Sequence, residues 1–204
     1  MNSLSKPLYA TPYGTAYLGD AIDLLKCLPE ESIDLVLTSP PFALLRQKEY
    51  GNVDQNEYVD WLLSFTIEVK RVLKETGSFL LDLGGAYRRE RPVRSLYNFP
   101  QKLPEFFIKL LTDAGDTVLD IFAGSNTTGV AAESLGRKWI AFEDNQTYLA
   151  TSTFRFLNKI DEKLIRILYE KLNSEGAAGI TIPQVIQLQI IEPEGEIETA
   201  RAKF

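Results

Sequence analysis

The stretch Thr38-Ser39-Pro40-Pro41-Phe42 places a hydroxyl, two proline carbonyls and an aromatic face side by side. The residues before it, Ile33–Thr38, are mostly apolar, as in a strand of a parallel sheet that is buried on both faces. Two prolines then prevent further ladder hydrogen bonds, so a rigid, exposed turn is expected. Because ligands of open α/β sheets sit at the carboxyl ends of strands, this turn is a candidate reactive site. The alternative is a loop that merely ends a strand.

A second candidate site has the parts of a nucleoside-binding strand-helix-strand unit. Asp120 ends the first strand, and Gly124 allows the backbone to pass close to a ligand. The helix that begins at Thr127 offers unpaired N–H groups, and Glu143, which ends the second strand, can accept both hydroxyls of a ribose. Ser125-Asn126 stands where the dinucleotide fingerprint has its second glycine, so the loop favours an uncharged or zwitterionic nucleoside over NAD.

The composition excludes several common kinds of site. The chain has no histidine and a single cysteine, Cys27, so internal disulfides and the usual zinc sites are absent and no metal is expected. Its 28 Asp and Glu against 22 Lys and Arg give a net charge of −6, which opposes nucleic-acid binding over the whole surface. The N-terminus has no apolar signal core and no stretch reaches membrane-spanning length, so we expect a cytoplasmic protein with no membrane partner.

Alternating strands and helices must position these two sites. Residues 1–13 are expected to form a loose arm, Asp20 to cap the first helix, and Gly77 to stop the long helix before it. The apolar patterns predict strands at 15–18, 33–38, 78–83, 117–122 and 138–143, and helices at 21–28, 56–74, 104–111, 127–135, 148–157 and 161–172. This order predicts an α/β fold with a mostly parallel sheet flanked by helices.

Two segments fall outside the alternation. Arginines interleaved with aromatic residues and prolines form the only dense basic patch of the sequence: Arg88, Arg89, Arg91 and Arg94. This composition suits contact with phosphates and bases, and the alternative is a solvated loop. In the C-terminal tail, residues 173–204, strict alternation over 185–191 predicts an extra, half-buried strand.

Taken together, the two candidate sites resemble those of the β-class amino-methyltransferases of DNA. These enzymes carry Asp/Asn/Ser-Pro-Pro-Tyr/Phe beside a site for S-adenosylmethionine. The Pro-Pro motif precedes the nucleoside loop here, as in the β class, and serine at its first position is usual among cytosine-N4 enzymes. The resemblance is strongest to the PvuII type and covers nearly all of residues 8–172. The stretches that carry it are Leu37–Ala43, Lys48–Asn52, Tyr58–Trp61, Gly84–Tyr87, Lys102–Phe107, Asp120–Phe122 and Gly124–Gly129.

The resemblance implies a Rossmann-like fold dependent on S-adenosylmethionine and a role for each candidate residue. The Ser39 hydroxyl and the Pro40 carbonyl would bind the two N–H groups of the target amine, on a turn that Pro41 makes rigid. Phe42 would stack on a base flipped out of the duplex. Asp82 would orient the turn or accept a proton, or serve as a plain loop anchor. The implied cofactor contacts are Asp20 and Phe122 at the adenine, Glu143 (or Asp144) at the ribose, and Asp120, Gly124, Ser125, Asn126 and Thr127 around the methionine end, with Thr38 as a further cofactor contact.

The chain departs from the family pattern at residues 99–100. In the family, a helix, two sheet strands and the target-recognition region separate Ser95–Phe99 from the stretch that begins at Lys102, whereas here the two are fused. We therefore expect a catalytic core over residues 1–172 whose sheet lacks its terminal strands and which has no recognition region. The strand at 78–83 would become an apolar edge, covered by the tail strand or by a second copy of the chain in a homodimer.

The resemblance thus implies a site-specific DNA methyltransferase of a restriction-modification system that acts on cytosine N4. Without the recognition region, we expect weak, salt-sensitive DNA binding through the basic patch. Adenine N6 is the alternative target, because both bases would present an amine to the same turn. An alternative of another class is a truncated remnant that binds the cofactor, or a subunit that needs a separate recognition partner.

Overall fold

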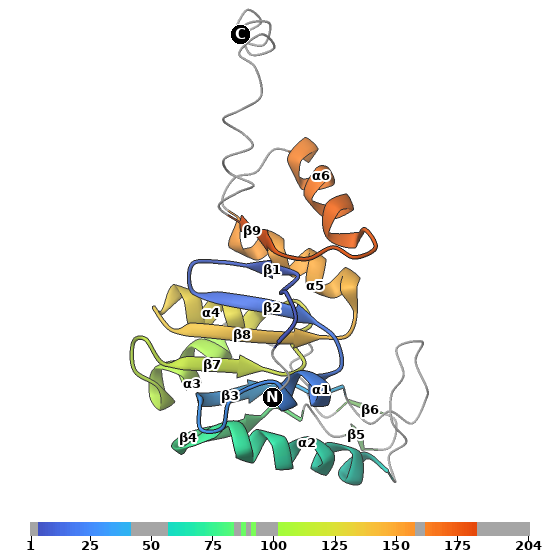
Figure 1. Ribbon diagram of the computed structural model, residues 1–204. Coiled ribbons are helices and arrows are strands. Elements are labelled where there is room, and N and C mark those ends of the chain that lie inside the picture. Colours follow the sequence, from blue (N-terminus) through green and yellow to red (C-terminus); the bar gives the residue numbers. More distant parts are fainter. Residues whose placement is uncertain are drawn as a thin grey trace, which may run out of the picture.

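The computed structural model describes residues 4–41, 57–83, 102–157 and 162–182, and the backbone of two short strands at 87–88 and 91–92. Its centre is a seven-stranded sheet in the order β4-β3-β7-β8-β2-β1-β9, parallel throughout except between β1 and β2 (Figure 1). The strands of this sheet are β1 (Tyr9–Ala10), β2 (Gly14–Leu18), β3 (Ile33–Thr38), β4 (Leu73–Leu81), β7 (Thr117–Asp120), β8 (Lys138–Glu143) and β9 (Ile180–Thr181). The helices are α1 (Ala21–Lys26), α2 (Tyr58–Val72), α3 (Lys102–Leu111), α4 (Thr127–Ser134), α5 (Gln146–Ser152), the 3₁₀ turn η1 (Thr153–Phe156) and α6 (Glu162–Asn173). The predicted α/β class is confirmed.

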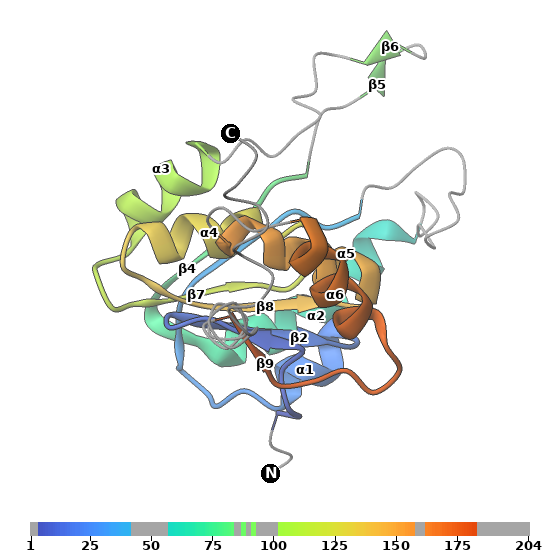
Figure 2. The same ribbon diagram turned by 90° about the horizontal axis from the view of Figure 1, so that it is seen from above.

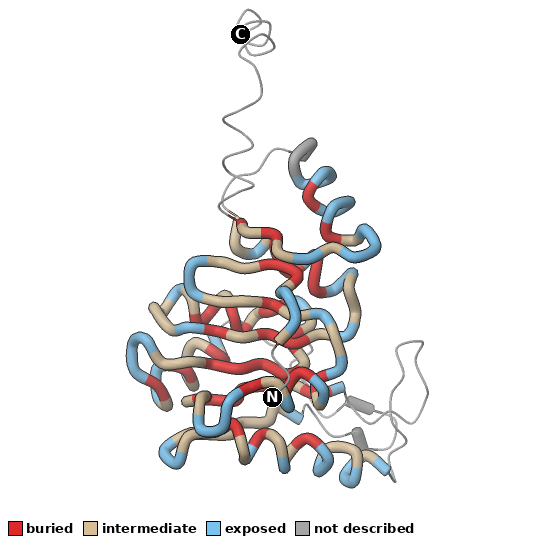
Figure 3. Tube along the Cα trace, in the orientation of Figure 1, coloured by how far each residue is buried: buried red, intermediate tan, exposed pale blue. Residues whose placement is uncertain are grey.

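Helices cover both faces of the sheet, and each face has its own apolar core. On one face, α1 and α2 bury residues such as Leu25 and Phe65 against Val36 of β3. On the other face, α3, α4 and α5 pack around residues such as Ile108 and Trp139 (Figure 2). Burial is therefore concentrated in the central strands, while the outward faces of the helices are exposed (Figure 3). Strand β3 is almost wholly buried, which explains why its sequence is a nearly continuous apolar run.

Residues 8–10 belong to the core and the sheet, so the expectation of a loose arm over residues 1–13 is wrong for this part of it. Strand β1 pairs antiparallel with β2, and both Leu8 and Tyr9 are buried. The ring of Tyr9 packs against those of Trp139 and Phe156, which come from the other end of the sequence. A two-residue strand is too short to show a periodic pattern, and its burial depends on these distant partners.

The junction between α2 and β4 also differs from the prediction. The helix ends at Val72 rather than near residue 74, and β4 begins at once with Leu73. The pairing with β3 then skips from Leu73 opposite Ile33 to Ser78 opposite Leu35. Gly77 lies within this irregular stretch, where an added Cβ would come to 3.1 Å from the carbonyl oxygen of Ile33. Gly77 therefore permits close passage of two backbones and does not stop the helix.

The sheet edges bear on the predicted loss of terminal strands. As expected, β4 is an edge strand among the described residues, with Leu80 half-buried and Leu83 exposed. The described sheet nevertheless has seven strands, because β1 and β9 extend its opposite edge. The tail thus starts at the edge far from β4. Residues 185–191 lie outside the described part, so the cover of β4 by this segment or by a second copy stays a prediction.

Candidate active site

The two predicted sites meet at one edge of the sheet. Strands β3 and β7 are parallel neighbours, but the helices that follow them, α2 and α4, lie on opposite faces. In open α/β sheets, ligands bind at the carboxyl ends of the strands where such a divergence occurs. The Ser-Pro-Pro turn follows β3 and the loop Ala123–Asn126 follows β7, so both lie at this position.

A buried hydrogen bond joins the two strand ends. The hydroxyl of Thr38, the last residue of β3, donates to Oδ1 of Asp120, the last residue of β7, over 2.7 Å. The same oxygen accepts from the backbone N–H of Phe122 at 3.1 Å. Burial raises the pKa of Asp120, while hydrogen bonds from Thr38, Thr128 and the Phe122 amide oppose the rise. Both Thr38 and Asp120 are buried, so their side chains fix the floor of the site.

The Ser39 hydroxyl is held in place by the end of β4. Its Oγ donates to the carbonyl oxygen of Asp82 over 3.2 Å, and the Asp82 amide donates to the carbonyl of Thr38 over 3.0 Å. Because its proton is engaged in this way, the Ser39 oxygen presents lone pairs to an incoming donor. Pro40 is buried and Pro41 is exposed at the mouth of the turn, whereas Phe42 lies outside the described residues.

The loop after β7 is shaped by two residues with left-handed backbone. Gly124 has φ of +50°, and no heavy atom lies within 4 Å of the position that a Cβ would take. Asn126 has φ of +53°, and its N–H donates to the carbonyl of Ala123 over 2.6 Å. The side chain of Asn126 caps α4 by accepting from the N–H of Gly129 at 3.0 Å. The tight loop thus leaves open space beside Gly124, as a ligand approach requires.

The carboxylate of Glu143 faces this loop. Its Oε2 accepts from the Gly124 N–H at 2.7 Å and its Oε1 accepts from the Asn145 N–H at 3.0 Å. Burial, with a contribution from neighbouring Asp144, raises the pKa of Glu143 to about 7. Asp144 itself is exposed. Each oxygen of Glu143 keeps a lone pair, which suits the two hydroxyls of a ribose.

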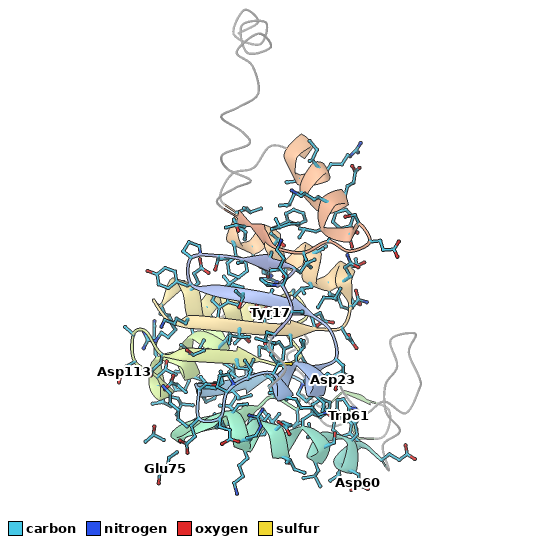
Figure 4. The ribbon with its side chains drawn as sticks, viewed as in Figure 1. Tyr17, Asp23, Asp60, Trp61, Glu75 and Asp113 are labelled. Carbon is cyan, nitrogen blue, oxygen red and sulfur yellow. The ribbon has the colours of Figure 1, made fainter. Side chains whose placement is uncertain are left out.

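An aromatic cluster lies at the carboxyl end of β7. Phe122 stacks on Trp61 of α2, with ring centres 5.6 Å apart, and meets Phe65 edge-on at 5.1 Å. Figure 4 shows Trp61 at the end of the molecule opposite Glu75 and Asp113, which is the end where β3 and β7 finish. The apolar pattern of the helix predicted at 56–74 gives no signal for this contact, because only the fold brings Phe122 to Trp61.

The polar residues of the loop differ in what they can offer. Asn126 is fully buried, and besides capping α4 it donates from Nδ2 to the Tyr9 hydroxyl over 2.9 Å. Its side chain therefore shapes the loop from behind. Ser125 is exposed, and its Oγ lies 3.4 Å from that of Thr127 and accepts from the Arg155 guanidinium at 3.1 Å. Arg155 was not a predicted site residue, because only the fold brings η1 to the loop.

Asp20 caps helix α1, as the sequence predicts. Its Oδ1 accepts from the N–H groups of Ile22 and Asp23, which confirms that it caps α1. The N–H of Gly19 donates to the carbonyl of Glu143 over 3.0 Å, so Asp20 follows a strand whose end is tied to that of β8. This position keeps the exposed Asp20 near the loop edge of the sheet.

Other expectations concern metals, membranes and DNA. Within the described ranges, no three His, Cys, Asp or Glu side chains gather as metal ligands would. None of the helices described is long and apolar enough to span a bilayer. Of the basic patch, the structure describes only backbone: Arg88 lies opposite Arg91 in a separate antiparallel pair, β5 (Tyr87–Arg88) and β6 (Arg91–Pro92). Arg89 and Arg94 lie outside the described residues.

Several known proteins are similar to this chain in sequence and in structure. The type II methyltransferase M.PvuII of Proteus hauseri is 32% identical over 315 residues, which cover 86% of this chain and 94% of that protein. M.BamHI of Bacillus amyloliquefaciens is 25% identical over 267 residues, covering 82% of this chain and 63% of the relative. The solved PvuII DNA methyltransferase, described as cytosine-N4-specific, superposes with a TM-score of 0.77 at 34% identity, over 89% of this chain and 99% of that one.

The family comparison also locates a discontinuity. A family model described as DNA methylase matches residues 33–98 and again 94–154, so two parts of the model meet at residues 94–98. The alignment with M.PvuII is longer than the whole chain of 204 residues, so at least 111 of its positions have no counterpart here. The matched segments contain both the Ser-Pro-Pro turn and the loop Ala123–Asn126. On these grounds the chain belongs to the DNA methylase family.

Proposed function

We propose that the chain transfers a methyl group from S-adenosylmethionine to the N4 amine of a cytosine in DNA, in the cytoplasm and as part of a restriction-modification system. The observation that carries the proposal is the Ser39 hydroxyl, whose proton is engaged by the Asp82 carbonyl at the edge of the sheet that also holds Asp120 and the Gly124 loop. Family membership and the likeness to M.PvuII support the same activity.

The chemistry explains why an acceptor is needed at this point. The lone pair of an exocyclic cytosine amine is delocalised into the ring, which makes the nitrogen a poor nucleophile. The Ser39 oxygen and the Pro40 carbonyl can accept from its two N–H groups and so favour a more tetrahedral nitrogen, whose lone pair is available for attack. Because the amine is inaccessible within a stacked duplex, the base must be flipped out, and Phe42 follows the turn in a position to stack on it.

The residues of the β7 and β8 ends would hold the cofactor. S-adenosylmethionine would supply the methyl group: the carbon–sulfur bond breaks as the nitrogen–carbon bond forms, S-adenosylhomocysteine leaves, and the nitrogen gives up a proton to the Asp82 carboxylate or to water. Glu143 would accept the ribose hydroxyls, and the open space at Gly124 would admit the cofactor beside the backbone. Phe122 and Asp20 would contact the adenine, while Thr38, Asp120, Ser125, Asn126 and Thr127 would form or shape the site of the methionine end.

Transfer of labelled methyl groups to mixed-sequence DNA tests the activity. We expect incorporation by the wild type and a fall of at least about tenfold in the rate of methyl transfer in Ser39→Ala, because the variant lacks the hydroxyl that would accept a hydrogen bond from the target amine in the transition state. Base analysis of the product separates cytosine N4 from adenine N6, the target that remains as the alternative. No incorporation by the wild type under any cofactor concentration would contradict the proposal for the isolated chain.

A second candidate is a catalytic subunit that works with a separate recognition polypeptide. It is favoured by the 111 or more positions of M.PvuII that have no counterpart here, and by the meeting of the two family matches at residues 94–98. The isolated chain would then bind DNA weakly and without sequence preference, through Arg88, Arg89, Arg91 and Arg94. Restoring the corresponding segment of M.PvuII between residues 98 and 102 would test this candidate: sequence-preferring methylation should appear only in the chimera.

The homodimer, in which a second copy would cover β4, is tested by measuring the molecular mass of the protein in solution.

A further inference from the structure

A chain of buried hydrogen bonds runs behind the loop Ala123–Asn126. Nδ2 of Asn126 lies 2.9 Å from the Tyr9 hydroxyl, which lies 2.6 Å from Oγ of Ser152. Ser152 in turn donates to the carbonyl of Leu149 over 2.7 Å. All three side chains are buried, and they come from β1, α5 and the N-cap of α4. These hydrogen bonds therefore hold β1, α5 and the start of α4 together at Asn126.

The direction of these bonds follows from their ends. Because the proton of Ser152 goes to the Leu149 carbonyl, Ser152 accepts from Tyr9, and the Tyr9 oxygen accepts from the Asn126 amide. Burial raises the pKa of Tyr9 to about 12, so its hydroxyl keeps its proton throughout the neutral range. With Nδ2 engaged, Oδ1 of Asn126 is directed to the N–H of Gly129. The sequence has a glycine there because a Cβ would collide with the Asn126 side chain.

We propose that Tyr9 is a positioning residue for the cofactor, acting through Asn126 on the Gly124–Thr127 loop. The inference rests on the proposed function, in which this loop holds the methionine end. Asn126 adopts a left-handed backbone that non-glycine residues seldom take, and its buried amide donor needs a partner to keep it there. Without the Tyr9 hydroxyl, the amide loses that partner, and the loop samples conformations that do not fit the cofactor. The Tyr9 ring packs in the core, whereas its hydroxyl would hold Asn126 in the conformation that the cofactor needs.

Calorimetric binding of S-adenosylmethionine and of S-adenosylhomocysteine to Tyr9→Phe tests the inference, because phenylalanine keeps the ring in the core. We expect both dissociation constants to rise about fivefold to tenfold, as the loss of one hydrogen bond to a buried amide implies. In methyl transfer, KM for the cofactor should rise equally, with kcat at saturation unchanged. Tyr13→Phe is the matched control, because its ring is exposed, and both constants should stay at wild-type values.

A double-mutant cycle with Asn126→Gly shows whether Tyr9 acts through Asn126. Glycine tolerates the positive φ but has no amide, so Tyr9→Phe should have no further effect on cofactor binding in that background. Equal binding by wild type and Tyr9→Phe, or a fall in melting temperature with unchanged dissociation constants, overturns the inference while leaving the proposed function intact. Failure of the wild type to bind either ligand overturns the proposed function itself.

Discussion

The Thr38 hydroxyl donates a buried hydrogen bond of 2.7 Å to the Asp120 carboxylate, and so joins the strand that carries the Ser-Pro-Pro turn to the strand that carries the loop Ala123–Asn126, the proposed cofactor loop. The two residues are 82 positions apart in sequence. Because both are the last residues of their strands, their contact sets the spacing between the proposed methyl acceptor and the proposed methyl donor.

Replacing Thr38 with valine should therefore lower the stability of the fold and weaken binding of the cofactor. Valine has a similar volume but cannot donate, so the buried Asp120 carboxylate loses one partner, and the free energy of unfolding should fall by about 1–3 kcal/mol. Denaturant unfolding followed by circular dichroism measures the change. Thr38→Ser, which keeps the hydroxyl, should lose less; equal losses in the two variants would show that the hydrogen bond contributes nothing.

Stability should fall with rising pH where Glu143 titrates. Its pKa is raised from 4.5 to about 7, so the folded protein binds this proton more tightly than the unfolded chain. The contribution to the free energy of unfolding is present in full below pH 4.5 and is lost as the pH rises to about 7. Glu143→Gln should lack this dependence in unfolding curves recorded across that range. A variant with the same pH profile as the wild type would contradict the assignment to Glu143.

Cofactor affinity should change with pH in the opposite sense. The charged carboxylate of Glu143 is the better acceptor for ribose hydroxyls, so binding should strengthen as the pH rises through about 7. Calorimetry with S-adenosylhomocysteine, which carries the same ribose, measures the effect. The Glu143→Gln variant should bind weakly at every pH; a steep pH profile in that variant would assign the titration to another group.

A comparison of Gly124 with Gly136 separates the effect of backbone strain on stability from an effect on cofactor binding. Gly124 and Gly136 both have positive φ, +50° and +72°, and a Cβ would meet no atom within 4 Å at either. Alanine at each position should cost about 1 kcal/mol of stability because of the backbone strain. Gly124→Ala should in addition weaken cofactor binding, whereas Gly136→Ala, at the opposite end of β8, should not. Thermal unfolding and calorimetry of both variants provide the comparison.

Tryptophan fluorescence should report cofactor binding. The chain has two tryptophans, of which Trp139 is buried with its indole N–H bonded to Glu133, while Trp61 stacks on Phe122, just after β7. Addition of S-adenosylmethionine should change the emission of the wild type through Trp61. The change should be absent in Trp61→Phe; if it persists there, the signal comes from Trp139 and Phe122 does not border the cofactor.

The sequence predicted those parts of the fold whose signals are local. Strands β3 and β8 have the predicted bounds, because each is a buried run between strong breaking signals. The α2–β4 junction was misjudged because Gly77 is typical of a helix end, whereas its role depends on the facing carbonyl of Ile33. The burial of Tyr9 and the contacts of Asn126 and Trp61 depend on residues far away in sequence, so no pattern within a segment could indicate them.

The order of the strands separates the hydrogen bonds behind the proposed cofactor loop from the discontinuity in the family match. Tyr9, which accepts from Asn126, lies in β1, near the edge of the sheet opposite β4. The discontinuity at residues 94–98 follows β4 in the chain. A segment inserted at that point would therefore leave in place the hydrogen bonds that hold the proposed cofactor loop from behind.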